Sequence, residues 1–141
     1  MTGRELFLLD TNVLSESRKK QADARVMEFL SSIDPGSLYI SVLTVGELRK
    51  GVALKERSDP YTASLLRSWV DGLELGFSDR ILGIDKPTAR LWGELSAQRP
   101  RAVIDTLIAA TSIVHGLTLV TRNVDDVSEL NLKVLNPWLQ G

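Results

Sequence analysis

The stretch Leu6-Phe7-Leu8-Leu9-Asp10-Thr11-Asn12 decides how the rest of the chain is interpreted. Its four consecutive apolar residues end abruptly at an acid, and a short run of this kind is typical of a strand that is buried on both faces. Asp10 then follows the strand directly. A carboxylate at that position either caps the next helix or a turn, or it serves a site at the end of the strand, and Asp10 by itself leaves both interpretations open.

Short apolar runs alternate with longer amphipathic segments along the rest of the chain. Further strands are expected at residues 38–40, 80–84, 117–121 and 133–135. Helices are expected at residues 23–33 and 42–55, from Pro60, from the Asp85–Pro87 start signal, and at residues 105–115. Strands separated by helices indicate parallel pairing with right-handed crossovers. We therefore predict a single three-layer α/β/α domain over residues 1–141, with a central parallel sheet of about five strands.

The composition excludes several classes of site. The chain has 141 residues and a formal net charge of -1, so no overall basic field attracts nucleic acid, and a polyanion would have to be bound through local charge. The absence of cysteine excludes disulfides, thiolate nucleophiles and Cys-ligated metals, and it fits a reducing cytoplasm. One histidine, His115, leaves no His-pair metal site. We expect neither a secretory signal nor a membrane-spanning segment.

Acidic residues recur at the inferred strand ends and helix starts. Asp10, Glu47, Asp105 and one of Asp125 or Asp126 each occupy such a place, and in a parallel sheet these places lie along one edge. Carboxylates that face each other repel unless they are protonated or neutralised by a cation. Mg²⁺ and Mn²⁺ prefer such oxygen ligands, so the pattern predicts metal-assisted hydrolysis of a phosphodiester.

The order of the motifs resembles that of PIN-domain ribonucleases, and in particular the FitB-like branch of the VapC-type toxins of bacterial toxin–antitoxin pairs. The matching motifs cover nearly the whole chain: Leu9-Asp10-Thr11-Asn12, residues 41–48, Asp105-Thr106-Leu107-Ile108-Ala109-Ala110-Thr111, Thr121-Arg122-Asn123 with Asp126, and Asn136-Pro137-Trp138. A single motif such as Asp-Thr-Asn carries little information. Several motifs in this order are far more specific.

This resemblance implies a PIN-like α/β/α fold and a Mg²⁺- or Mn²⁺-dependent endoribonuclease. It implies catalytic and metal-binding roles for Asp10, Glu47, Asp105 and Asp126, with hydrogen bonds to these acids from Thr11, Asn12, Thr44, Thr121 and Asn123. It also implies a cytoplasmic homodimer, an antitoxin segment laid across the active-site groove, and contact with DNA only through the antitoxin. Val127 departs from the aromatic residue that is frequent after the fourth acid, and the doublet leaves Asp125 open as that acid.

Three alternatives follow from the same residues. A PIN-like domain could bind a partner without catalysing a reaction. A phosphorelay receiver would use Asp85 after the third predicted strand, but such a domain needs an acid pair after the first strand, and only Asp10 is there. An aspartyl-phosphate phosphatase would need a second acid where this chain has Asn12.

Overall fold

Strand β1 (Phe7–Leu9) lies at the centre of the sheet in the computed structural model, which describes residues 4–139. The other strands are β2 (Leu38–Ser41), β3 (Ile81–Leu82), β4 (Thr118–Val120) and β5 (Val134–Leu135). Their order across the sheet is β3-β2-β1-β4-β5, and every neighbouring pair is parallel. This arrangement confirms the predicted fold class.

The apolar runs in the sequence arise because both faces of the sheet are covered. Phe7 and Leu9 pack into one hydrophobic core, whereas Leu8 between them packs into a second core on the opposite face. Strand β4 behaves in the same way, with Val120 in the first core and Leu119 in the second. Since side chains alternate along a strand, a strand between two helical layers has to be apolar at every position.

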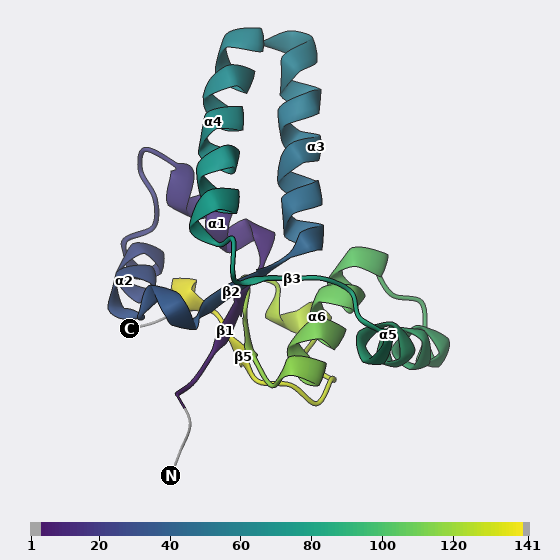
Figure 1. Cartoon of the computed structure of the whole chain (residues 1–141). Coiled ribbons are helices and arrows are strands. Elements are labelled where there is room, and N and C mark those ends of the chain that lie inside the picture. The colour runs from purple at the N-terminus through teal and green to yellow at the C-terminus, as the bar shows by residue number, and fades with distance from the viewer. Residues whose placement is uncertain (1–3, 140–141) are drawn as a thin grey trace.

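Helices form the outer two layers (Figure 1). Helices α1 (Thr11–Arg18), α2 (Ala24–Ser32), α3 (Val42–Ser58) and α4 (Pro60–Gly76) contribute to the first core. Helix α6 (Val103–His115) contributes to the second core, and α5 (Lys86–Gln98) packs against α6. Short 3₁₀ turns are η1 (Pro35–Ser37), η2 (Val124–Asp126) and η3 (Pro137–Leu139). Across residues 4–139, no helix has the length and apolar character needed to cross a bilayer.

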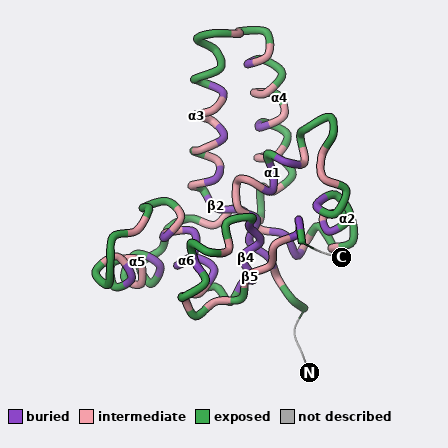
Figure 2. Tube along the Cα trace, turned by 180° about the vertical axis from the view of Figure 1, so that it is seen from behind, coloured by how far each residue is buried: buried purple, intermediate pink, exposed green. Residues whose placement is uncertain are grey.

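Helices α3 and α4 form a hairpin that extends away from the sheet (Figure 1). Asp59 ends α3 and starts α4, because its carboxylate accepts a hydrogen bond from the Thr62 backbone N–H at 3.1 Å and Pro60 occupies the first helical position. Figure 2 shows that the far end of this hairpin is mostly exposed.

Several predicted boundaries differ from the structure, and for two of them the physical reason is visible. Strand β3 contains only Ile81 and Leu82 instead of residues 80–84, because the chain leaves the sheet at the exposed Gly83 and Ile84. Helix α6 begins at Val103, two residues before the predicted start at Asp105, and its cap residue Ala102 makes no side-chain hydrogen bond. Asp105 therefore lies within the first turn of α6.

The strand order places one particular gap at the carboxyl edge of the sheet. From β1 the chain moves outward to β2 and β3, and it then returns to the other side of β1 for β4 and β5. The carboxyl ends of β1 and β4 therefore border the position where the direction of winding reverses, which is where α/β sheets commonly bind ligands. Asp10 directly follows β1, and Thr121 directly follows β4.

Candidate active site

Asp10 is held from two sides at this switch point. Its Oδ1 accepts a hydrogen bond from the Thr11 backbone N–H at 2.7 Å, which caps α1. Its Oδ2 accepts a second hydrogen bond from the buried Thr121 hydroxyl at 2.9 Å. Burial raises the pKa of Asp10 above its ordinary value, and the charge of Glu47 adds to that effect, although the two hydrogen bonds oppose it. The Asp10 carboxylate is thus fixed in position but is costly to ionise.

Glu47 reaches the same place from α3. Ser41 at the end of β2 caps this helix, because its hydroxyl accepts a hydrogen bond from the Leu43 N–H at 3.0 Å. The Thr11 hydroxyl donates to Glu47 Oε1 at 2.5 Å and lies 3.1 Å from the Thr44 hydroxyl. Thr11 consequently contacts both acids, Asp10 through its backbone and Glu47 through its side chain.

Asp105 extends the group of acids from the other side of the sheet. Burial raises the pKa of Asp105, and the negative charges of Asp10 and then Asp126 raise it further. Within residues 4–139, no side chain or backbone group donates a hydrogen bond to this carboxylate. Asp105 therefore lies within electrostatic range of acids from the end of β1 and from η2, and no hydrogen-bond donor in residues 4–139 offsets their charge.

The fourth acid comes from the doublet in η2. Asp126 raises the pKa of Asp105, whereas Asp125 has no such effect. Both residues line a pocket of about 230 Å³ that Asp105 also lines. Asp10 and Glu47 do not line this pocket, so the hydrogen-bonded pair and the pocket acids are joined through the Asp10–Asp105 interaction. These contacts favour Asp126 over Asp125 as the fourth acid of the group.

The five polar residues named from the sequence do not all touch a carboxylate. Thr11 and Thr121 do so directly. Asn12 instead donates to the Thr121 hydroxyl at 3.3 Å, and Asn123 contacts that same hydroxyl through its backbone N–H at 3.1 Å. Thr44 contacts the acids only through Thr11. The structure thus builds a second layer behind two threonines, where the resemblance implied direct contacts.

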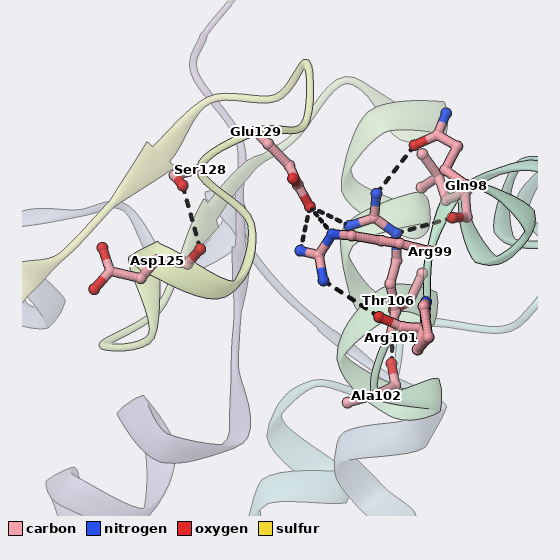
Figure 3. Close-up of polar contacts among 10 residues, drawn as sticks. Gln98, Arg99, Arg101, Ala102, Thr106, Asp125, Ser128 and Glu129 are labelled. Carbon is pink, nitrogen blue, oxygen red and sulfur yellow. Dashed lines mark hydrogen bonds and ion pairs between the residues drawn. The ribbon is translucent and has the colours of Figure 1, made fainter.

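The wall of the pocket contains two arginines that lie outside the motifs identified in the sequence. Arg99 and Arg101, from the loop between α5 and α6, line it together with the acids, and Glu129 binds both guanidinium groups (Figure 3). Arg99 and Arg101 flank Pro100 just before the start of α6. That spacing beside a helix carrying a site acid is the one sequence signal that could have drawn attention to them.

The donor set suits a hard cation, although its geometry is open. In the part of the chain that the structure describes, no three His, Asp or Glu side chains already form an arrangement that would hold a metal ion. The four acids nonetheless offer only carboxylate oxygens, the ligand type that Mg²⁺ and Mn²⁺ prefer. A cation between them would also relieve the repulsion that raises the pKa values of Asp10 and Asp105.

Asp85, the residue that a receiver domain would phosphorylate, has a structural role. Its carboxylate accepts a hydrogen bond from the Thr88 backbone N–H at 2.9 Å and caps α5. Its other oxygen lies 3.1 Å from Nε2 of His115, at the end of α6. Asp85 and His115 line a separate pocket that none of the four acids reaches. The receiver alternative therefore finds no support in this geometry.

The sequence that forms this arrangement matches a known protein family. Residues 7–130 match the family model described as the PIN domain. The chain belongs to the PIN-domain family. This PIN-domain protein is 36% identical over 138 residues to toxin FitB of Neisseria gonorrhoeae, a match that covers 94% of the chain and 99% of the relative. It is 32% identical over 139 residues to VapC ribonuclease Y4jK of Sinorhizobium fredii, covering 94% of the chain and 98% of the relative.

A solved structure supports the same grouping. The chain superimposes on the crystal structure of FitAcB from Neisseria gonorrhoeae with a TM-score of 0.87 and 33% sequence identity, covering 96% of this chain and 100% of that one. The resemblance to VapC-type PIN toxins is therefore confirmed over almost the full length of the chain.

Proposed function

We propose that this PIN-domain protein is a Mg²⁺- or Mn²⁺-dependent endoribonuclease that hydrolyses RNA phosphodiester bonds and acts as the toxin of a type II toxin–antitoxin pair. The observation that carries the proposal is the convergence of Asp10, Glu47, Asp105 and Asp126 from four separate chain segments. Two of these acids have raised pKa values, and their causes include the charge of another member of the set. The names of the relatives, a toxin and a ribonuclease, support the same activity.

The four carboxylates would hold the cation. When bound, a divalent cation neutralises phosphate oxygens and increases the acidity of water, which favours hydrolysis of the phosphodiester. Two of the acids are already held in place by hydrogen bonds. Thr11 and Thr121 bind the Asp10 carboxylate, and Thr11 also binds Glu47. Donors behind the acids restrict how the carboxylates rotate, which is a common role of residues around a metal site.

Asp105 is the acid that we assign to proton transfer. Asp10 already accepts two hydrogen bonds, whereas no described group donates to Asp105. A carboxylate with a raised pKa is a better base than an ordinary one. In the proposed reaction a carboxylate oxygen of Asp105 accepts the proton of the attacking water as the phosphorus–oxygen bond to the leaving nucleotide breaks, while Asp10 keeps the position set by Thr11 and Thr121.

The proposed toxin needs partners as well as a substrate. A ribonuclease that attacks RNA of the cytoplasm in which it is made needs an inhibitor, and an antitoxin segment across the groove would cover the acids. Tyr61, Leu65 and Leu75 leave apolar surface exposed on α4, which suits a homodimer or the antitoxin. The net charge of -1 offers no general attraction for DNA, so we assign contact with DNA to the antitoxin.

The test is RNA cleavage by the purified protein with Mg²⁺ or Mn²⁺, beside the Asp10→Asn variant and a sample containing a chelator. Asparagine caps a helix as well as aspartate does, so the variant keeps the start of α1 and removes mainly the charge. We expect cleavage by the wild type only, and only with the metal. Equal cleavage by both proteins would indicate a contaminating nuclease, and no cleavage by either would favour the binding-only alternative.

A further inference from the structure

An ion-paired cluster borders the acidic pocket. Arg99 and Arg101 both bind one oxygen of Glu129, with Arg99 Nε at 2.7 Å and Arg101 Nη1 at 2.6 Å from Oε1 (Figure 3). These two guanidinium groups, Arg99 first, hold the pKa of Glu129 below its ordinary value. Both arginines line the same pocket as Asp105 and Asp126. The pocket therefore holds two of the proposed site acids and two positively charged arginines.

The two arginines are bound in different ways. The side chain of Arg101 is only 6% exposed, and its remaining nitrogens donate to the Leu95 carbonyl at 2.8 Å and to Gln98 Oε1 at 3.0 Å. The side chain of Arg99 is 48% exposed, and within residues 4–139 its only hydrogen bond apart from those to Glu129 is to the adjacent Pro100 carbonyl at 3.2 Å. Arg101 is thus part of the framework. Arg99 depends on an exposed ion pair, a kind of contact that is readily exchanged for another.

We propose that Arg99 binds a phosphate of single-stranded RNA beside the bond that is cut, and that Glu129 occupies Arg99 while no RNA is present. This inference rests on the proposed ribonuclease function. The planar guanidinium of arginine binds phosphate oxygens through paired N–H donors, as it binds the Glu129 carboxylate. When the phosphate takes the place of Glu129 at Arg99, Glu129 remains bound to the buried Arg101.

If Glu129 competes with RNA for Arg99, replacing Glu129 should change RNA affinity in the opposite direction from the one expected if Glu129 only holds two loops together. If Glu129 only ties two loops together, replacing it with glutamine loosens the pocket and weakens RNA binding. If Glu129 competes with the phosphate, the same change releases Arg99, removes a repelling charge and strengthens RNA binding. The Glu129→Gln variant loses the negative charge but still offers an amide oxygen to Arg101, so it keeps the buried contact.

The experiment measures binding of a short fluorescein-labelled single-stranded RNA of mixed sequence, in the Asp10→Asn background with chelator, so that neither cleavage nor metal contributes. We expect Arg99→Gln to weaken binding about 5- to 10-fold and to reduce the slope of log K against log salt by about 0.7. We expect Glu129→Gln to tighten binding roughly threefold. Arg99→Lys keeps the charge without the paired donors and should fall between the wild type and Arg99→Gln.

Arg67 and Glu56 supply the matched control. They form an ion pair between α4 and α3 with side chains 42% and 53% exposed, close to the 48% and 46% of Arg99 and Glu129. Arg67→Gln and Glu56→Gln should leave RNA affinity unchanged, and thermal melts check that every variant is folded. Equal affinity of Arg99→Gln and Arg67→Gln overturns the inference, as does weaker binding by Glu129→Gln. Failure of the proposed function would appear separately, as a lack of Asp10-dependent cleavage by the otherwise native protein.

Discussion

The Thr121 hydroxyl donates a hydrogen bond to Asp10 that both orients this carboxylate and lowers its pKa. Thr121→Val keeps the shape of this buried side chain but removes the donor to Asp10 Oδ2 and the acceptor for Asn12 and Asn123. Loss of a group behind a metal-binding carboxylate is expected to lower kcat/KM for RNA cleavage by about 10- to 100-fold. Because the Thr121 hydrogen bond lowers the pKa of Asp10, the acidic limb of the pH–rate profile should also move to higher pH.

The control for this change is Thr118→Val, at the start of the strand that Thr121 follows. Thr118 is also buried, but its hydroxyl donates to Glu5 at 2.7 Å and to none of the four proposed site acids. The variant should lose some stability and keep the pH profile of the wild type. Identical pH profiles for the two variants, or an equal loss of activity, would contradict the role assigned to Thr121.

The two adjacent acids of η2, Asp125 and Asp126, are expected to have different effects on RNA cleavage. Asp126 raises the pKa of Asp105, whereas the Asp125 carboxylate points away from Arg99 and Arg101 (Figure 3). We expect Asp126→Asn to lower kcat of RNA cleavage by about 100-fold or more, because it removes a proposed metal ligand, and Asp125→Asn to cost less than about 3-fold. Steady-state kinetics at saturating Mg²⁺ measure both, and the reverse order would assign the fourth position to Asp125.

At the scale of the element, the first turn of α6 carries the proposed site acid Asp105, which is expected to cost stability. Because the folded state raises the pKa of Asp105 above 3.8, it binds more protons than the unfolded state as pH passes upward through that window. The free energy of unfolding therefore falls across the window, and the full loss is present at pH 7. Asp105→Asn should stabilise the metal-free protein at pH 7 by less than about 1 kcal/mol, since solvent screens the charge and the α6 dipole favours it.

Urea unfolding with chelator between pH 4 and 8 measures this effect, and Asp23→Asn provides a control of opposite sign. Arg25 lowers the pKa of Asp23 through a side-chain hydrogen bond, so that contribution to stability is present above pH 3.8 and is lost as pH falls through the folded pKa. Asp23→Asn should therefore destabilise the protein at pH 7. A destabilised Asp105→Asn variant would show that the carboxylate serves the fold.

The elements also show which features the sequence could predict. Strand β1 and the acid after it were predictable because an apolar run and a capping carboxylate are both local signals. The predicted start of α6 lies two residues too late, because Ala102 makes no side-chain cap and nothing in the local sequence marks Val103 as the first helical residue. The contact of Arg99 with Glu129 spans 30 residues, and only the packing of the η2 loop against the start of α6 brings the two together.

At the scale of the whole molecule, the net charge of -1 conceals an uneven distribution. Acids that are far apart in the sequence gather at the carboxyl edge of the sheet, because parallel strands end on the same side. The sequence could therefore predict that these acids lie along one edge of the sheet, but not the distances between their oxygens, which depend on side-chain packing in both outer layers. Within residues 4–139 these acids do not already form a group that could hold a metal ion, so the proposed cation site would require their side chains to move closer together.

The response of the whole fold to metal follows from this distribution. A cation that binds the native state and not the unfolded state stabilises it by about 2.7 kcal/mol at a hundredfold excess over Kd, or roughly 10 °C in Tm for a chain of this size. Thermal melts with increasing Mn²⁺ should show such a saturable rise in the wild type and a much smaller one in Asp105→Asn. Asp59→Asn, which alters the junction between α3 and α4 and none of the four acids, should keep the full shift.

The decisive result is which of two proteins, the wild type or Asp105→Asn, has the higher melting temperature without metal and with it. Without metal, Asp105→Asn should melt above the wild type, because its folded state no longer carries a repelled carboxylate. With saturating Mn²⁺, the wild type should melt above Asp105→Asn, because the same carboxylate now has a cation to bind. A purely structural aspartate cannot produce this reversal, since its contribution would keep one sign with and without metal. Parallel shifts in both proteins would instead indicate weak cation binding elsewhere on the surface and would remove Asp105 from the proposed site.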